Sequence, residues 1–315
     1  MSRTDPDGRF RSTYVPYADT GRLRSSENPL DTGGNAQNWD LEARDVVIPD
    51  KGCIFLGVDM SLAEDRDTKV RTKSERLIKL ARIPPWEADF HRQAAAKIFH
   101  KYEKDVTKDE RFIGKRARHD SNYSDEGMGG AGLSDALLKE GYTYTEEECQ
   151  EFIDLVREPE VLDWHRSIRQ QVLRTRTLTN AWGRSISYEY ERLEPKLYHR
   201  AYAYLPQSDI GDLMTQWGLL KLDAFIQDTD LGKTRINQDG HDSLLISVEP
   251  YMAYYIADFL KGCLERSLTY DGVELSMYCE FSLGSCWLFK PEHEWKRLPK
   301  EKEFTEVAHG LLESV

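Results

Sequence analysis

The stretch CIFLGVDM, residues 53–60, decides how the rest of the sequence is interpreted. A short apolar run of this kind is typical of a buried strand, and this one leads up to Asp59. Near the other end of the chain, Asp242 precedes a second apolar run, Leu244 to Val248, and the pair Asp239–Gly240 just before it indicates a turn. If the two strands are neighbours, the two carboxylates lie at one end of the sheet.

Two carboxylates at one sheet end suit a hard cation. Mg²⁺ prefers oxygen ligands and is usually bound by one or two carboxylates together with substrate phosphates. Two such ions about 4 Å apart can activate an attacking oxygen and stabilise a leaving one. The alternative is that Asp59 and Asp242 each cap only a strand or a turn.

The segment RFIGKRARHDSNY, residues 111–123, is predicted to be a helix. Thr107 followed by Glu110 fits a capping box, which starts the helix at about residue 108. The glycines of residues 127–132 would end it. Gly114 inside the helix costs about 1 kcal/mol relative to alanine.

Residues four apart on this helix form a stripe of functional side chains: Arg111, Lys115, His119 and Tyr123. Arg111 lies in the first turn, where the helix dipole favours anions. His119 is about 12 Å from Arg111 along the axis, roughly the length of a triphosphate with its sugar. The stripe therefore suggests phosphates near Arg111 and Lys115, and a sugar and base nearer His119 and Tyr123. A solvated basic face is the alternative.

Composition excludes several classes of protein. The chain has 315 residues, 39% of them hydrophobic, which suffices for one large domain or two smaller ones. No apolar run is long enough to span a membrane, and the N-terminus does not resemble a signal peptide. Five scattered cysteines without a CxxC pair argue against a zinc site or disulfides and for a reducing compartment. The net charge of −12 argues against strong non-specific nucleic-acid binding.

Strands are predicted towards both ends of the chain and helices between them, which indicates an α+β fold with a mainly antiparallel sheet and a helical insertion. Residues 1–50 are predicted to be loops and turns. Two helical stretches are predicted within 74–103, with a break at Pro84–Pro85. Further helices are predicted over 145–174, 208–227 and 251–266 and in the charged tail after Lys296. A hairpin is predicted over 178–190 and a strand over 273–281.

Three motifs resemble those of the family A DNA polymerases, the DNA polymerase I type. VDMSLAEDR, residues 58–66, resembles Asp-Tyr-Ser-Gln-Ile-Glu-Leu-Arg and matches at Asp59, Ser61, Glu64 and Arg66. It departs at Met60, Leu62, Ala63 and Asp65. The stripe resembles Arg-x3-Lys-x7-Tyr, with Arg111, Lys115 and Tyr123 in register. GHDSLLISV resembles His-Asp-Glu followed by apolar residues, with His241 and Asp242 matched and Ser243 in place of the Glu.

Three further segments resemble the same family. DTGRLRSSENP, residues 19–29, resembles Thr-Gly-Arg-Leu-Ser-Ser. ADFHRQAAAKIF, residues 88–99, resembles its Asp-Ile-His-Arg segment, and PQSDIGD, residues 206–212, resembles Gln-Gly-Thr-Ala-Ala-Asp. Each motif alone is weak, but six occur in order, from about Asp7 to Trp287.

The resemblance implies a right-hand polymerase fold, with an antiparallel palm sheet and a helical fingers insertion. Residues 1–66 would form the N-terminal part of the palm with the first catalytic Asp, and residues 67–175 the fingers. Residues 176–290 would complete the palm with the second catalytic Asp, and residues 291–315 would be a charged tail.

It also implies a role for each matching residue. Asp59 and Asp242 would hold two Mg²⁺ ions, which Mn²⁺ could replace. Arg111, Lys115 and His91 would face the phosphates of the incoming dNTP, and Lys115 would protonate or neutralise the leaving pyrophosphate. Glu64 would crowd the sugar 2′ position, His119 would lie near the sugar, and Tyr123 near the templating base. The residues expected to contact the DNA primer–template are Arg22, Gln207 and His241.

Other interpretations stay open. Single-subunit RNA polymerases of the phage type share the two aspartates and often have His-Asp-Ser, but they carry a small residue where Glu64 stands. A degenerate structural subunit of a replication complex is the non-enzymatic alternative, for which Leu62 and Ser243 leave room. His91 could be a surface histidine, and Gln207 a residue that starts a helix.

The family's helical thumb precedes these motifs, which begin here almost at once, at DPDGRF, residues 5–10. Without a thumb, a chain of net charge −12 should bind primer–template weakly. We expect a phage-like split polymerase, in which a second polypeptide supplies the thumb. This chain shows no exonuclease signature, so the second polypeptide could also supply an exonuclease. A piece of a longer chain is the alternative. The expected location is the cytoplasm, that of a host cell if the protein is viral.

Overall fold

The computed structural model describes residues 4–16, 18–39, 41–270 and 272–313. Residues 1–3 of the predicted N-terminal palm segment and residues 314–315 of the predicted charged tail lie outside the described residues. The chain divides into two compact units. We call Met1–Ala63, Gln207–Leu268 and Ser276–Val315 the sheet unit, and Glu64–Pro206 with Thr269–Leu275 the helical unit.

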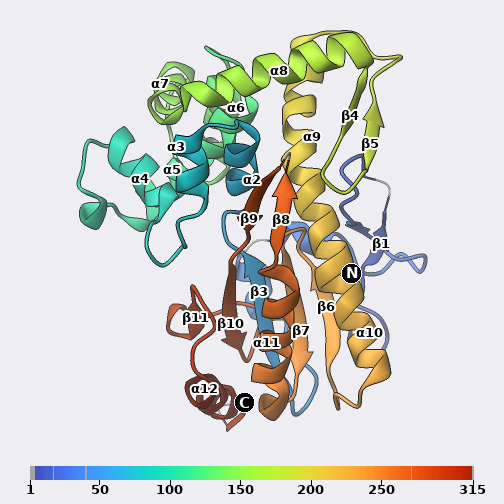
Figure 1. Cartoon of the computed structure of the whole chain (residues 1–315). Helices are drawn as coiled ribbons and strands as arrows, with labels where there is room; N and C mark the ends of the chain where they lie inside the picture. The colour runs from blue at the N-terminus through green and yellow to red at the C-terminus, as the bar shows by residue number, and fades with distance from the viewer. Residues whose placement is uncertain (1–3, 17, 40, 271, 314–315) are drawn as a thin grey trace. The chain divides into compact units, whose positions relative to one another are not determined.

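The sheet unit is built on a five-stranded antiparallel sheet in the order β11-β10-β3-β7-β6 (Figure 1). Strand β3 (Ile54–Met60) is central, and its apolar residues are buried because the sheet is covered on both faces. The other strands are β6 (Arg235–Asp239), β7 (Ser243–Val248), β10 (Cys279–Gly284) and β11 (Glu294–Trp295). The predicted α+β class with antiparallel strands is confirmed.

The two faces of the sheet have different cores. Helices α11 (Ala253–Leu264) and α12 (Glu301–Glu313) pack on one side of β3 and β10. On the other side, Phe55 belongs to a cluster with Trp287 and with the partly buried Trp39. A Cβ at Gly57 would meet the Phe289 ring at 2.7 Å, so only glycine lets that ring lie on the sheet.

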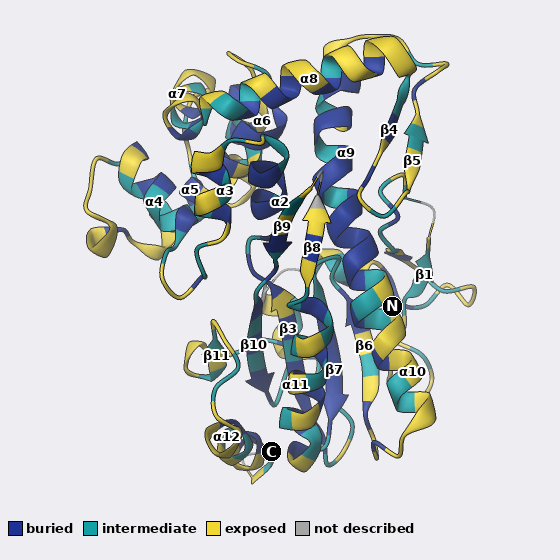
Figure 2. Cartoon of the chain, viewed as in Figure 1, coloured by how far each residue is buried: buried dark blue, intermediate teal, exposed yellow. Residues whose placement is uncertain are grey.

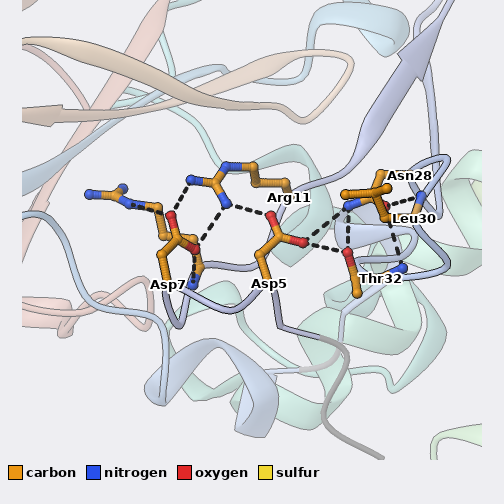
Figure 3. A network of polar contacts seen from close by, with 7 residues as sticks. Asp5, Asp7, Arg11, Asn28, Leu30 and Thr32 are labelled. Carbon is orange, nitrogen blue, oxygen red and sulfur yellow. Dashed lines mark hydrogen bonds and ion pairs between the residues drawn. The ribbon is translucent and has the colours of Figure 1, made fainter.

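The N-terminal part of the sheet unit consists mainly of loops, as predicted. Its short elements are β1 (Thr13–Val15), β2 (Arg24–Ser26), η1 (Ala36–Asn38) and α1 (Leu41–Asp45). A polar network holds the first loop (Figure 3): Arg11 binds Asp7 at 2.6 and 3.0 Å and also binds Asp5, which accepts hydrogen bonds from Thr32 and Asn28. Through the hydrogen bond from Asn28 to Asp5, the network connects the family-like segment of residues 19–29 to the loop that precedes it.

The helical unit contains the helices predicted within 74–103, at about 108–123 and over 145–174, and also helices at residues 63–71 and 130–139 that were not predicted. They are α2 (Ala63–Arg71), α3 (Glu75–Ala81), α4 (Phe90–Ile98), η2 (Glu103–Asp105), α5 (Lys108–Tyr123), α6 (Gly130–Lys139), α7 (Glu146–Val156) and α8 (Pro159–Thr175). Buried residues follow one side of α8, and its other side is exposed (Figure 2). None of the described helices is long and apolar enough to span a membrane.

Local signals place several of these elements correctly. The capping boxes at Thr107 and Thr145 are both formed, and α5 and α7 begin one residue later. The predicted hairpin is formed by β4 (Thr177–Thr179) and β5 (Ser185–Ser187). Helix α5 ends at Tyr123, before the glycines that were expected to stop it.

Other predictions need correction. The helix expected over 208–227 is α9 (Pro195–Leu213), a π-helical segment η3 (Met214–Leu219) and α10 (Leu220–Asp228) in succession. The strand expected over 273–281 is divided between β9 (Val273–Ser276), which pairs with β8 (Ser267–Tyr270), and β10. The tail helix α12 buries Phe304, Ala308 and Leu311, because it packs on the sheet.

Candidate functional site

The two aspartates predicted for a metal site lie at one end of two adjacent strands of the sheet unit. Asp59 is exposed near the end of β3, and its register partner on β7 is Ser243. Asp242 directly precedes β7, and its carbonyl oxygen accepts a 2.8 Å hydrogen bond from the backbone nitrogen of Met60. The expected adjacency of the two strands is confirmed, because β3 pairs with β7 in register from Ile54–Val248 to Asp59–Ser243.

A third carboxylate lies beside Asp59. Glu280 on β10 is the register partner of Asp59 on the side opposite to β7, so the two side chains share one face of the sheet. The hydroxyl of Ser61 donates a 2.7 Å hydrogen bond to Oε1 of Glu280. Sequence reasoning missed Glu280, and the only signal available was its place in an alternating stretch.

The donor set at this end of the sheet fits a divalent cation that completes its shell with substrate. Among the residues that the structure describes, no group of three or more histidine, cysteine or acidic side chains forms a ready-made metal cage. Mg²⁺ does not need one, because it commonly takes one or two carboxylates together with waters and phosphates. Asp59 and Asp242 supply oxygen donors of the required kind.

His241 lies in a tight turn between β6 and β7. Its φ of 80° is in the left-handed region, and its backbone nitrogen donates a 2.9 Å hydrogen bond to Oδ1 of Asp239. Burial raises the pKa of Asp239, although the hydrogen bond from His241 and the charge of Arg22 oppose the rise. Asp239 therefore does more than signal a turn, since it fixes the backbone of His241.

Gln37 joins this turn to the segment that carries Arg22. Its amide nitrogen donates to the carbonyl oxygens of Asp239 at 2.9 Å and Leu23 at 3.0 Å, and lies 3.4 Å from Nδ1 of His241. The structure thus brings together two of the residues predicted to contact DNA. No motif of the sequence pointed to Gln37.

Gly211 accounts for the close approach of the same segment to α9. A Cβ at this position would meet Cγ of Arg22 at 3.0 Å and the carbonyl oxygen of Thr20 at 3.3 Å. Gln207 stands four residues earlier on α9, and hence on the same face as Gly211. The third residue predicted to contact DNA therefore lies on the helix face that meets Arg22.

The four-residue stripe of the helical unit lies on one face of α5. Lys115 and His119 are exposed, whereas Tyr123 is 9% exposed. The His119 and Tyr123 rings contact edge to face with centroids 4.9 Å apart. Nε of Arg111 binds Oδ2 of Asp89 at 2.7 Å, which ties the first turn of α5 to the residue that caps α4.

Glu64 meets the far end of this stripe. The Tyr123 hydroxyl donates a 2.8 Å hydrogen bond to Oε2 of Glu64, and Nε2 of His119 lies 3.9 Å from the same oxygen. The carboxylate, the imidazole and the phenol thus form one group, whereas the cations Arg111 and Lys115 lie one to three helical turns earlier. Such a face has anion-binding groups at one end and hydrogen-bonding and aromatic groups at the other.

His91 is carried by α4, which crosses α5 at close range. A Cβ at Gly114 would meet the His91 carbonyl oxygen and the Ala95 nitrogen, both at 2.6 Å, so the crossing requires glycine. Burial, followed by the nearby charge of Lys115, lowers the pKa of His91 to about 3. The imidazole is therefore neutral at pH 7, and would meet a phosphate as a hydrogen-bond donor without a positive charge.

Comparison with known proteins supports one family. The sequence model of DNA polymerase family A matches residues 2–288. A DNA polymerase of Bacillus phage SP01 is 24% identical over 190 residues, which are 58% of this chain and 20% of the phage protein. The POL domain of Pol1 from M. smegmatis, solved in complex with DNA primer-template and dNTP, matches with a TM-score of 0.69 and 22% identity over 90% of this chain and 49% of that chain. This chain thus spans about half of the structural neighbour and a fifth of the phage protein.

Proposed function

The chain belongs to DNA polymerase family A, and from this premise we propose that it catalyses template-directed DNA synthesis. In this reaction the 3′-oxygen of a primer attacks the α-phosphorus of a dNTP. The new bond joins O3′ to the α-phosphorus, the bond to the pyrophosphate oxygen breaks so that pyrophosphate leaves, and the hydroxyl proton passes to water. Positioning and charge stabilisation supply most of the catalysis in phosphoryl transfer.

In this proposal Asp59 and Asp242 hold two Mg²⁺ ions. Bound there, the ions would supply charge stabilisation for the attacking and leaving oxygens. The support is that both residues lie at one end of the β3–β7 pair and provide the oxygen ligands that Mg²⁺ prefers. Lys115 protonates or neutralises the pyrophosphate, a role that suits an exposed ammonium group on the first half of α5.

The same proposal assigns the face of α5 to the incoming nucleotide. Arg111 and Lys115 bind the phosphates of this nucleotide, and the neutral imidazole of His91 also binds them. Glu64 crowds the sugar 2′ position, and its hydrogen bond to Tyr123 holds the carboxylate in one orientation. His119 lies near the sugar, and Tyr123 near the templating base.

Primer–template contacts are assigned to Arg22, Gln207 and His241. Gln37 and Gly211 support this grouping, since they bring the Arg22 segment to the His241 turn and to α9. We further propose that tight duplex binding needs additional protein, in the same polypeptide or in a partner. The net charge of −12 leaves little general affinity for DNA phosphates.

One observation carries the proposal beyond the family match: a single face of α5 presents Arg111, Lys115, His119 and Tyr123 in that order, with Glu64 on Tyr123. The decisive experiment is extension of a labelled primer on a DNA template, with dNTPs and Mg²⁺, compared with the same mixture lacking Mg²⁺. Template-dependent, Mg²⁺-dependent extension is expected. Extension with ribonucleotides alone would favour the RNA polymerase alternative, and no extension at high protein concentration would favour a structural subunit.

A further inference from the structure

Asp65 is a buried carboxylate on α2, next in sequence to Glu64, and it is 8% exposed. Its Oδ1 accepts hydrogen bonds from Nε of Arg118 at 2.9 Å and from Nδ2 of Asn122 at 3.1 Å, both on α5. Its Oδ2 binds the ammonium group of Lys69 one turn along α2. The motif that this stretch resembles has a leucine at this position, so the network is a departure of this chain.

The network carries a large amount of buried charge. Arg118 and Lys69 are 7% and 2% exposed, and both lie over the ring of Phe90, with Cζ and Nζ at 5.4 and 5.1 Å from its centroid. Burial by itself disfavours the charged carboxylate, but the two cations outweigh it and hold the pKa of Asp65 well below its ordinary value. A buried ion that loses its partner is costly, so this set of contacts resists separation of α2 from α5.

The last turn of α5 is also held from its other sides. Nε2 of His165 lies 2.8 Å from the carbonyl oxygen of Asn122. Arg157 donates to the carbonyl oxygens of Ser124 at 2.5 Å and Ser121 at 3.2 Å, which satisfies acceptors that a helix end leaves free. These two contacts come from α8 and from the end of α7, whereas the Asp65 contacts come from α2.

The neighbours of this network in sequence are two residues of the proposed nucleotide site, one assigned to the sugar and the other to the templating base. Asp65 adjoins Glu64 on α2, and Asn122 adjoins Tyr123 on α5. The 2.8 Å bond between Tyr123 and Glu64 therefore spans the same two helices that the buried network joins. A change in the spacing of these helices changes that hydrogen bond.

We infer that Asp65 is a positioning residue, which fixes α2 against α5 through Arg118 and Asn122 and thereby sets the Glu64–Tyr123 hydrogen bond. This inference rests on the proposed function for its consequence, the rejection of ribonucleotides. The structural part of the inference, that Asp65 fixes α2 against α5, does not depend on the proposed function. Asp65 is not among the residues that the proposed function places against substrate.

The test uses Asp65→Asn, Arg118→Gln and the double variant in the full chain. Arg116→Gln is the matched control, because Arg116 is also on α5 but its ion pair with Glu140 is exposed, at 3.4 Å. Two quantities are measured for each protein: backbone hydrogen exchange over residues 118–124, and kcat/KM for a ribonucleotide divided by that for the matching deoxynucleotide.

We expect Asp65→Asn to speed exchange over residues 118–124 and to raise the ribonucleotide ratio by about 3- to 10-fold, the size of effect of one hydrogen bond. kcat for the deoxynucleotide should stay within about 2-fold, since the reacting groups are untouched. The double variant should differ little from Asp65→Asn, because each substitution breaks the same contact, the ion pair between Asp65 and Arg118. The control should match the unchanged protein in both measurements.

If Asp65→Asn speeds hydrogen exchange over residues 118–124 but leaves the ribonucleotide ratio unchanged, the positioning role is wrong. If hydrogen exchange is also unchanged, Asp65 does not fix α2 against α5. If the unchanged protein extends no primers, the proposed function fails, and the sugar consequence fails with it, while the exchange data still decide the structural part. If Asp65→Asn does not fold, Asn122→Ala replaces it. That variant removes one neutral donor and should raise the ratio by a smaller factor, and no rise would overturn the inference.

Discussion

The hydroxyl of Tyr123 lies 2.8 Å from Oε2 of Glu64, so a residue at the end of α5 is hydrogen-bonded to one in the first turn of α2. Sequence comparison assigned the two residues separate roles, near the base and near the sugar. The bond makes them one unit, because moving either side chain changes the other. Changes at the two positions should therefore not be additive.

Glu64→Ala should let the protein incorporate ribonucleotides much more readily relative to deoxynucleotides. The change removes the carboxylate that, in the proposed function, crowds the sugar 2′ position. Tyr123→Phe, which deletes only the hydroxyl, should shift the ratio in the same direction by less. The measurement is the ratio of kcat/KM for each nucleotide pair. An unchanged ratio in Glu64→Ala would contradict the role of Glu64 at the sugar 2′ position and favour the RNA polymerase alternative.

Asp59→Asn and Asp242→Asn should each abolish primer extension with Mg²⁺. Each substitution keeps the shape of the side chain and removes the charge that a divalent cation needs. Asp258→Asn, on the exposed side of α11, is the control and should retain activity. Circular dichroism should show an intact fold in all three. Near-normal extension by either active-site variant contradicts the two-metal assignment.

His119 should govern the use of dideoxynucleotides. Its ring is exposed, contacts Tyr123 edge to face, and carries a polar nitrogen but is shorter than a tyrosine. Intermediate dideoxynucleotide use is expected, raised in His119→Tyr and lowered in His119→Phe. Chain termination is compared at fixed ratios of dideoxy- to deoxynucleotide. Equal termination by all three proteins would separate His119 from the sugar.

Acid should destabilise the helical unit in part through His91. Its pKa in the folded chain is lowered from 6.5 to about 3, mainly by burial. Between these values the unfolded chain binds a proton that the folded chain does not, so stability is lost as pH falls through this window. His91→Gln should therefore show a smaller fall in melting temperature between about pH 7 and about pH 4.

His100→Asn is the control for that experiment. His100 is exposed and has a φ of 51°, a left-handed conformation that asparagine tolerates. It should melt like the unchanged protein at every pH. The same slope in His91→Gln as in the unchanged protein would show that this imidazole binds a proton in the folded chain as readily as in the unfolded chain, which contradicts a lowered pKa.

Binding of primer–template by this chain should be weak and should depend only weakly on salt concentration. Few DNA phosphates can be neutralised by a chain whose net charge is −12. Fluorescence anisotropy at several salt concentrations measures the affinity and its salt slope. Adding further protein that supplies a thumb, in the same polypeptide or as a partner, should increase affinity and processivity. Processive synthesis by this chain alone would contradict the expectation.

Much of the fold could be predicted because its signals are short-range. The capping boxes at Thr107 and Thr145 act within one helical turn, and both helices begin where these pairs place them. The stripe on α5 follows from the helical period alone. Prediction failed where packing decides, as in the strand expected over 273–281, which is divided between two sheets.

The sequence by itself determined the strand that carries Asp59, a second strand after Asp242, and the order of side chains along α5, because each depends on residues a few positions apart. Only the tertiary structure decided that Glu280 lies beside Asp59, that packing around the imidazole lowers the pKa of His91, and that Asp65 on α2 binds Arg118 and Asn122 on α5. These relationships join residues from about 20 to more than 200 positions apart, and no local pattern encodes such pairs. They depend on which surfaces meet when the chain packs, and there burial and partner charges set the state of each group.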